Sequence, residues 1–133
     1  MASKYNNRRM ALDGYIFDSK DESKYYELLK ERKAKGLIIN FELQPRYILQ
    51  GAAPEVGIRK IEYVGDFVIY HLDGTEEVID IKGMATEGAL LKRKMFLYKY
   101  RNLKLTWLCR SLKYGDADGW IEFEELKKRR KKW

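Results

Sequence analysis

The stretch from Tyr63 to Gly83 constrains the fold of this chain most, because it predicts two adjoining strands with charges at their ends. One apolar run follows Asp66, and a second leads into Asp80 and Lys82. Side chains alternate along a strand, so Asp80 and Lys82 share one face and the apolar Ile81 between them points to the other. We therefore expect the apolar face to be buried and the charged face to border a cleft.

The turn between these strands decides which residues lie opposite each other. A three-residue loop at 72–74, with Gly74 at a positive φ, would place Asp66 opposite Asp80 on the same face. A two-residue turn would instead place Asp66 opposite Ile81. The sequence leaves both registers open.

The charged residues of this stretch have a defined chemical use. Two neighbouring carboxylates repel each other, and charges are costly to remove from water. A hard divalent cation, held by carboxylate, carbonyl and water oxygens, makes such a pair favourable. A nearby lysine can then handle a proton or the charge that develops on a phosphate. Asp66, Asp80 and Lys82 thus point to metal-assisted phosphodiester hydrolysis, and the alternative is a half-exposed hairpin with ordinary surface charges.

The same residues carry a family resemblance. Gly65-Asp66, thirteen intervening residues and Asp80-Ile81-Lys82 resemble the bipartite D…(D/E)-x-K motif of the PD-(D/E)xK nuclease superfamily, with Gly65 at the place of the nominal proline. Over residues 4 to 108 the chain resembles a group of small phage and prophage proteins of that superfamily. The further features that it shares with them are Phe17-Asp-Ser-Lys-Asp-Glu22 before a helix, Gln44-Pro45 after the next strand, and Lys82-Gly83 before a basic helix.

This resemblance implies a fold and an activity. The fold is a single-domain α/β protein with a restriction-endonuclease-like αβββαβ core, in which helices flank a central mixed sheet. The activity is that of a metal-dependent endodeoxyribonuclease that hydrolyses DNA phosphodiesters in phage replication or recombination. Branched, Holliday-junction-like or nicked DNA is one expected substrate, and a homodimer is one expected assembly.

The resemblance also assigns roles to individual residues. Asp66 and Asp80 would hold Mg²⁺ or Mn²⁺, Glu22 would complete or bridge the metal site, and Lys82 would polarise the attacking water. Gln44 would lie beside the active site and orient a water or a phosphate through its amide.

Glu22 and Gln44 also have simpler interpretations. Ser19 and Glu22 have the spacing of a capping box, so the Glu22 carboxylate could reach back to the backbone of Ser19. Against this, Glu22 shares a helix face with Tyr26 and Leu29, at the end of the expected buried stripe. Gln44 could be a plain residue at a strand end before proline.

Length and composition set the class of protein. The 133 residues, 45% of them hydrophobic, fit one domain over 1–133, with a core at about 15–108, a basic N-terminal arm at 1–9 and a C-terminal helical extension at 109–133. No apolar run is long enough to cross a bilayer, and no leader is recognised, so we expect a cytoplasmic protein, in a bacterial host if phage-encoded. A single cysteine and a single histidine exclude an intrachain disulfide and the usual zinc-site spacings.

The net charge of +7 favours a polyanionic partner, and DNA is the expected one. Residues 127–132 supply six of these charges, which leaves +1 for the rest of the chain, so the tail could equally be a solvated terminus. The candidate phosphate contacts are Arg8, Arg9, Lys20, Lys92, Arg93, Lys94, Arg129 and Arg130.

The remaining elements follow from turn residues and periodicity. We expect a short hairpin around Asp13-Gly14, a helix that ends before Gly36, a strand over 37–43, a loop over 50–58 that would be the least ordered internal segment, a helix over 87–101 and a strand over 103–108. The expected core side of the second helix is Leu90, Leu91, Met95, Leu97 and Tyr98.

The C-terminal segment is predicted to form a turn and a closing helix that Trp120 and Phe123 pack down. Its residues 116–125 imitate half of an EF-hand loop, but Tyr114 stands where the first acidic ligand would be. Two other functions therefore remain beside the nuclease: a non-catalytic DNA-binding module and a calcium-responsive interaction protein. The first would bind DNA in EDTA without cleaving it.

Overall fold

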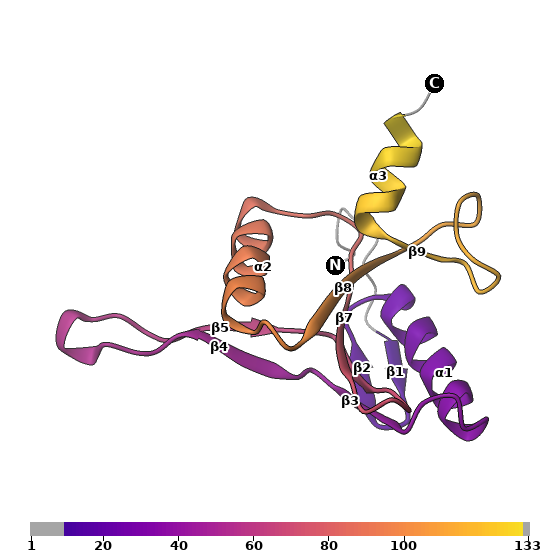
Figure 1. Cartoon of the computed structure of the whole chain (residues 1–133), viewed down its shortest axis with the longest axis horizontal. Helices are drawn as coiled ribbons and strands as arrows, with labels where there is room; N and C mark the ends of the chain where they lie inside the picture. Colours follow the sequence, from indigo (N-terminus) through magenta and orange to yellow (C-terminus); the bar gives the residue numbers. More distant parts are fainter. Residues whose placement is uncertain (1–9, 132–133) are drawn as a thin grey trace.

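The computed structural model describes residues 10–131, which form a mixed α/β fold with a central mixed sheet and three α-helices (Figure 1). Arg8 and Arg9 of the N-terminal arm lie outside the described residues. The elements in chain order are β1 (Met10–Leu12), β2 (Tyr15–Phe17), α1 (Lys20–Ala34), β3 (Asn40–Leu43), β4 (Arg46–Gln50), the 3₁₀ turn η1 (Pro54–Val56), β5 (Ile61–Val64), β6 (Phe67–Tyr70), β7 (Glu76–Ile81), α2 (Glu87–Lys99), β8 (Lys104–Arg110), β9 (Trp120–Glu122) and α3 (Phe123–Lys131).

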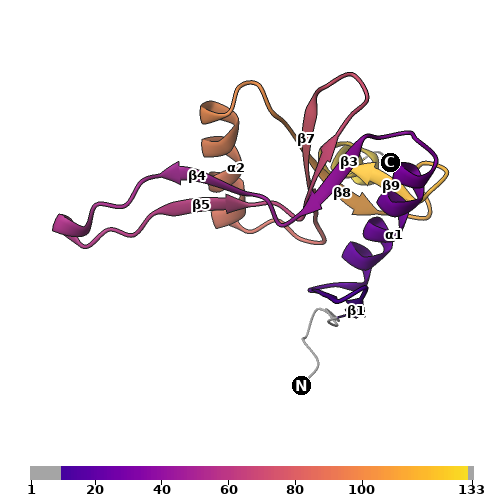
Figure 2. The ribbon, with the colours of Figure 1, turned by 90° about the horizontal axis from the view of Figure 1, so that it is seen from below.

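The central sheet has the strand order β3-β6-β7-β8-β9. Its neighbours are antiparallel except β7 and β8, which are parallel and are connected through α2. Two further hairpins, β1–β2 and β4–β5, stand apart from this sheet. Figures 1 and 2 show that the β4–β5 hairpin projects well beyond the body of the protein.

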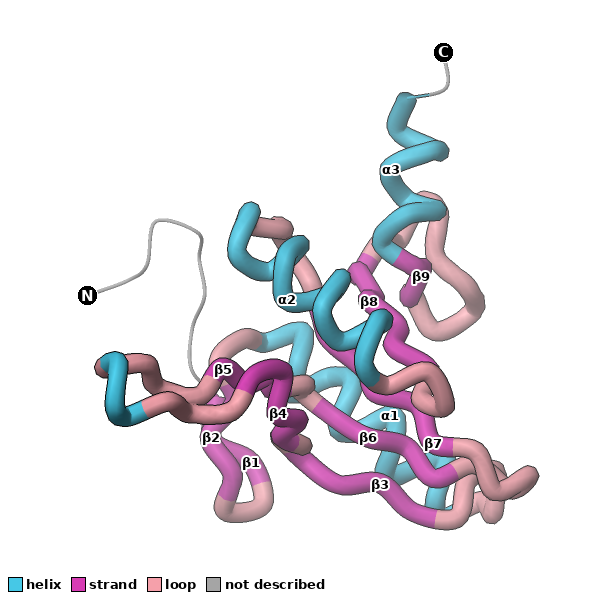
Figure 3. The backbone as a smooth tube through the Cα atoms, turned by 60° about the vertical axis from the view of Figure 1, so that its left-hand side comes forward, coloured by secondary structure: helices cyan, strands magenta, loops and turns pink. Residues whose placement is uncertain are grey.

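The two faces of the central sheet bury different cores, as strand alternation requires. Phe67, Ile69 and Ile79 pack with the aromatic and aliphatic residues of α1. Val68 and Val78, one step along the same strands, pack instead with Phe96 of α2 and with the β4–β5 hairpin. Helices α1 and α2 therefore cover opposite faces of the sheet (Figure 3).

Several sequence predictions are confirmed by this architecture. The Asp13-Gly14 hairpin forms, with both residues at positive φ, and α1 ends before Gly36, whose φ is 72°. The predicted closing helix forms, and the ring of Phe123 at its start lies edge-on to Trp107 at 5.4 Å. Trp120 is buried as well, but it packs against α1, edge-on to Tyr25 at 5.1 Å.

The prediction for the buried face of α2 is wrong in part, because of its five residues only Leu90 and Met95 are half-buried. Phe96 is the buried residue of this helix, whereas Leu91 is 60% and Tyr98 is 76% exposed, and Leu97 is exposed as well. The reason is that α2 packs on the narrow β4–β5 hairpin, where Phe96 meets Tyr47 and Tyr63 at ring-centroid distances of 5.1 Å each. A two-stranded partner covers a smaller arc of the helix than a full sheet would.

Two segments also differ from the predictions, and one strand is additional. The strand expected over 37–43 begins only at Asn40, and Leu37 and Ile39 are exposed. The segment expected as a loop over 50–58 is the end of the long hairpin, with a 3₁₀ turn and an isolated bridge between Ala53 and Ile58. Strand β9 was not predicted, since its three residues carry too little pattern to separate them from α3.

Gly65 connects β5 to Asp66 at a position where neighbouring side chains leave no space for a Cβ atom. A Cβ atom at this position would lie 2.7 Å from Cγ1 of the fully buried Val78 and 3.4 Å from Cγ of Pro45. The chain here also forms a backbone hydrogen bond of 3.0 Å from the N–H of Gly65 to the carbonyl of Pro45. Close packing at the root of the β4–β5 hairpin thus explains the glycine.

We predict that Gly65→Ala lowers the free energy of unfolding by about 1–3 kcal/mol, the usual cost of overpacking a tight core. Gly51→Ala is the matched control, because a Cβ atom at Gly51 would meet nothing within 4 Å. Urea denaturation of the three proteins measures the difference. Equal stability of Gly65→Ala and Gly51→Ala would contradict the packing argument.

Candidate functional site

The β6–β7 hairpin has the register that brings the two aspartates together. Phe67 pairs with Ile79, so Asp66 lies opposite Asp80. The three-residue loop is confirmed, because His71 donates its N–H to the carbonyl of Thr75 at 2.9 Å and Gly74 has a φ of 88°. The alternative register, with Asp66 opposite Ile81, is excluded.

Asp80 is the most deeply buried charged residue of the site, with 5% of its surface exposed. Its Oδ2 atom accepts a hydrogen bond from the Tyr63 hydroxyl and lies 3.6 Å from Nζ of Lys82. The Tyr63 hydroxyl in turn accepts a hydrogen bond of 2.8 Å from Nε1 of Trp107. One carboxylate oxygen of Asp80 is therefore fixed by a chain of three buried or half-buried side chains.

Lys82 lies between Asp80 and the ring of Trp107, 4.8 Å from the ring centroid. The guanidinium of Arg93 stands over the same ring at 4.1 Å and forms an ion pair of 3.1 Å with Glu124 of α3. Two cations thus share one indole ring, which holds both side chains near the buried aspartate.

Asp66 is tied to the sheet by its backbone and its side chain. Its N–H donates to the carbonyl of Ile79 at 3.0 Å, and its Oδ2 accepts from the N–H of Ile81 at 2.7 Å. Burial, followed by repulsion from Asp80 and Glu22, raises the pKa of Asp66 to about 8, and a hydrogen bond with the Asp80 carboxyl adds to the rise. The hydrogen bond from Ile81 opposes this shift.

Glu22 reaches the site from the first turn of α1. Ser19 caps this helix, and its Oγ accepts the N–H of Glu22 at 3.1 Å. Burial and then the nearby Asp18 carboxylate raise the pKa of Glu22 to about 7, and Asp80 adds a smaller rise. A backbone hydrogen bond from Asp18 and the charge of Lys82 oppose the shift. Glu22 is thus electrostatically coupled to the aspartates, beyond any capping role.

The Glu22 side chain stands between two surface pockets. One, of about 360 Å³, is lined by Glu22 with Asp66 and Gln44. The other, of about 530 Å³, is lined by Glu22 with Lys82 and Thr86, the N-cap of α2. Glu22, Asp66 and Lys82 therefore each border a surface pocket, whereas the buried Asp80 lines neither.

Gln44 lies where the sequence predicted, beside Asp66. Its backbone N–H donates to the carbonyl of Asp66 at 2.9 Å, and its side chain lines the same pocket. Its φ of 50° is unusual for a residue other than glycine and costs energy. The sharp corner between β3 and β4 holds this conformation at the edge of the pocket.

The acids of the site offer hard oxygen donors, the ligand chemistry that Mg²⁺ and Mn²⁺ prefer. Within residues 10–131, no ready-made group of three or more His, Cys, Asp or Glu side chains converges as a metal site. Mg²⁺, however, usually keeps several waters and takes one or two protein carboxylates. The Asp66–Asp80 pair fits that requirement, and Glu22 lies close enough to raise the pKa of Asp66 by repulsion.

The candidate DNA contacts are spread over three helices. Lys20, Lys92 and Lys94 are exposed, whereas Arg93 is held on Trp107. Arg129 forms an ion pair with Glu125 at 3.1 Å, and Arg130 is also engaged. The tail residues Lys127, Lys128 and Lys131 are exposed on α3, and Lys132 lies outside the described residues.

Two site residues were not assigned a role from the sequence. Tyr63 and Trp107 look like ordinary aromatic strand residues, and their alternation predicts only burial. Tyr63 lies on the same face of the fold as Asp80, but its strand pairs with β4 and not with β7. Only the three-dimensional packing brings its hydroxyl to the aspartate.

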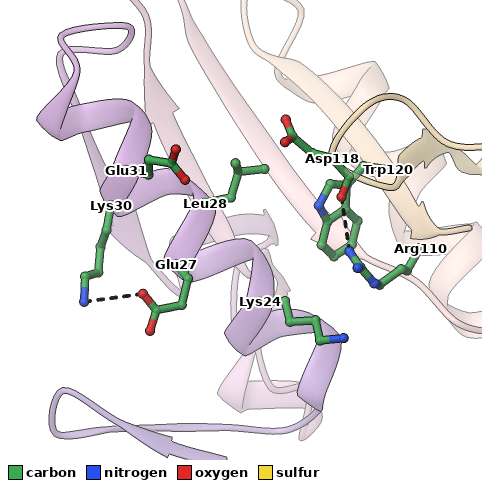
Figure 4. A pocket seen from close by; sticks show the side chains of 8 residues that line it. All are labelled: Lys24, Glu27, Leu28, Lys30, Glu31, Arg110, Asp118 and Trp120. Carbon is green, nitrogen blue, oxygen red and sulfur yellow. Dashed lines mark hydrogen bonds and ion pairs between the residues drawn. The ribbon is translucent and has the colours of Figure 1, made fainter. Parts of the chain in front are cut away.

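A third pocket, of about 610 Å³, lies between α1 and the loop before β9 (Figure 4). Its charges balance, with Lys24, Lys30 and Arg110 against Glu27, Glu31 and Asp118. The nearby Asp116 resembles a calcium ligand in sequence, but its Oδ1 accepts the N–H groups of Asp118 at 2.9 Å and Trp120 at 3.1 Å. The Asp116 carboxylate therefore stabilises the turn, and nothing here favours calcium.

No helix in the described part of the chain has both the length and the apolar character needed to cross a bilayer. A family model described as "Protein of unknown function (DUF1064)" matches residues 2–116, which include every residue of the acid cluster and leave α3 outside. A comparison with curated proteins finds no match.

We predict that the metal-free protein loses stability as the pH rises towards 8. A carboxyl whose pKa is raised on folding binds its proton more tightly in the folded state, so its stabilising contribution is complete below its ordinary value of 3.8 and is lost as the pH passes through about 8. Asp66→Asn should flatten the pH dependence of the free energy of unfolding, measured in EDTA. Asp73→Asn, in an exposed turn, should keep the original slope at neutral pH, and an unchanged slope in Asp66→Asn would refute the assignment.

Proposed function

The chain belongs to this family, whose description assigns it no activity, and we propose from the site itself that it is a divalent-metal-dependent endodeoxyribonuclease of PD-(D/E)xK type. The observation that carries the proposal is the pairing of Asp66 with Asp80, with Lys82 3.6 Å from the Asp80 carboxylate. Two carboxylates forced together at a strand end destabilise the fold unless a proton or a cation lies between them. A bound cation explains why such a pair would be kept.

The order of elements around the pair supports the same proposal. Helix α1, strands β3, β6 and β7, helix α2 and strand β8 occur in the order αβββαβ, with the β4–β5 hairpin inserted between β3 and β6, and these four strands belong to the central sheet. We propose that this is the restriction-endonuclease-like core. Gly65 takes the place of the motif's proline because the buried Val78 leaves no space for a side chain.

In the proposed reaction, the metal would supply a Lewis acid for the phosphate and an activated water. Asp66 and Asp80 would hold it, with Glu22 as an added charge on the side of α1. Lys82, which shares Trp107 with Arg93, would orient the attacking water and stabilise the negative charge that develops on the phosphate. Tyr63 would hold Asp80 in one rotamer through its hydroxyl.

The proposed substrate is DNA bound through its phosphates. Lys92 and Lys94 of α2 and the exposed lysines of α3 supply positive charge, and these helices are linked by the ion pair between Arg93 and Glu124. Such contacts bind nucleic acid without sequence preference. Action on branched or nicked DNA, as a homodimer, remains part of the proposal for the experiment to decide.

The second candidate function is a DNA-binding module without catalysis. Two observations favour it. Oδ2 of Asp80 already has partners in Tyr63 and Lys82. Within the described residues, no three His, Cys, Asp or Glu side chains converge as metal ligands. In that protein the lysine would replace the metal as the counter-charge of Asp80.

We predict that the protein cleaves DNA with Mg²⁺ or Mn²⁺ and that Asp80→Ala abolishes cleavage. Plasmid, single-stranded and four-way-junction DNA should be tested across a metal panel, with DNA binding measured in EDTA. Asp80→Ala should keep its DNA binding, and its free energy of unfolding is measured alongside, because the relief of repulsion from Asp66 is opposed by the loss of the acceptor for the Tyr63 hydroxyl. Wild-type protein that binds DNA but cleaves none of these substrates would favour the binding module. Metal-dependent cleavage by Asp80→Ala at more than about 5% of the wild-type rate would refute the role of Asp80.

Glu22→Gln separates a catalytic role from a capping role. Glutamine serves at this capping position as glutamate does, so a purely structural Glu22 predicts at most about 1 kcal/mol of lost stability and normal cleavage. We expect instead that single-turnover cleavage falls by roughly two to three orders of magnitude, since one negative charge leaves the metal site. Glu27→Gln, on the exposed side of the same helix, is the control and should retain full activity. Normal cleavage by Glu22→Gln would leave Asp66, Asp80 and Lys82 as the catalytic set.

A further inference from the structure

The pocket of about 360 Å³ beside Asp66 has a wall that the nuclease chemistry does not use. Strand β2 contributes Tyr15, Ile16 and Phe17 to this lining, and the end of β3 contributes Leu43, which is followed by Gln44. Glu22 and Asp66 line the same pocket. A substrate phosphate held at the acids would therefore have this pocket directly beside it.

The charges of the pocket exclude a second phosphate as its occupant. Among the described residues that line it, Glu22 and Asp66 are acidic and none is a lysine or an arginine. Another anion here would add repulsion, so the pocket suits a neutral group with apolar faces.

Tyr15 contributes an aromatic ring to the lining of the pocket. The residue is 47% exposed, and its ring packs edge-on against Tyr26 at 5.8 Å and at a tilt against Phe17 at 6.4 Å. Tyr26 is itself fixed by a hydrogen bond of 3.0 Å to Asp13 in the β1–β2 turn. A half-exposed ring held by aromatic neighbours loses little freedom when a planar group stacks on it.

Gln44 supplies the polar group of the pocket. Its amide has both donors and an acceptor, which can pair with the edge of any nucleobase. The left-handed backbone of Gln44 and its hydrogen bond to the carbonyl of Asp66 fix this residue relative to the acids. An aromatic face, aliphatic neighbours and one amide form the combination that single-stranded nucleic-acid sites use.

We propose that this pocket binds the base of a nucleotide next to the phosphate that is cleaved. The inference rests on the proposed function and names its substrate class, because a base can enter the pocket only when it is unpaired or readily unstacked. Single strands, flaps and branch points offer such bases, whereas continuous duplex must first break a pair.

The test has two independent readouts on the full chain. In the first, single-stranded oligonucleotides that carry 5-iodouracil are photocrosslinked to the protein in EDTA, and the linked residue is identified by mass spectrometry. In the second, cleavage is measured on single-stranded, flap and duplex DNA with an abasic nucleotide moved along the strand. The variants are Tyr15→Ala and Tyr15→Phe, with Tyr98→Ala as the matched control on the exposed side of α2.

We expect crosslinking to Tyr15, and we expect Tyr15→Ala to weaken binding of single-stranded DNA by roughly 5- to 150-fold, the effect of one lost base–aromatic stack. Tyr15→Phe keeps the ring and should bind normally, as should Tyr98→Ala. An abasic nucleotide should raise KM at one position beside the cleaved bond and nowhere else.

The outcomes separate this inference from the nuclease proposal. Cleavage that is unchanged in Tyr15→Ala, with no abasic position that matters, overturns the base pocket and leaves the nuclease standing. Crosslinking to Tyr15 without cleavage of any DNA overturns the nuclease and supports the pocket. Crosslinks at other residues but not at Tyr15 overturn the pocket.

Discussion

The structure depends on the burial of Asp80, which follows the fully buried Val78 and Ile79 near the end of β7. An ionised carboxylate in that position needs partners, and the chain supplies Tyr63, Trp107 and Lys82 in a connected chain of contacts. Tyr63 lies in β5, Trp107 lies in β8 and Lys82 directly follows β7, so three separate segments meet at one carboxylate.

The opposite aspartate turns this burial into a strained pair. Asp66 shares a hydrogen bond with Asp80 and has its pKa raised to about 8, and Glu22 is coupled to both acids from α1. A protein selected for stability alone would do better with apolar residues here. The carboxylate pair is therefore stabilised by bound positive charge, which is a proton in the free protein and would be a metal cation in the proposed enzyme.

What could be predicted from the sequence follows from local rules. The Asp73-Gly74 turn allowed a three-residue loop, and with that loop the period of two fixes Asp66 against Asp80. The capping residues likewise located α1 and, with it, Glu22. The buried face of α2 and the roles of Tyr63 and Trp107 depend on the β4–β5 hairpin as a packing partner, and periodicity does not tell which element covers a helix or where a buried hydroxyl finds its acceptor.

The position of Glu22 also bears on how a strand would cross the site. The pocket with Tyr15 and Gln44 lies on one side of this residue, and the pocket with Lys82 and Thr86 lies on the other. In the proposed complex, a base in the first pocket would leave the neighbouring nucleotide beside the second, and the strand would bend at the phosphate between them. A stacked duplex resists that bend, whereas a branch point or a single strand already has it. The placement of one helix N-terminus would thus select for DNA structure without any contact that reads sequence.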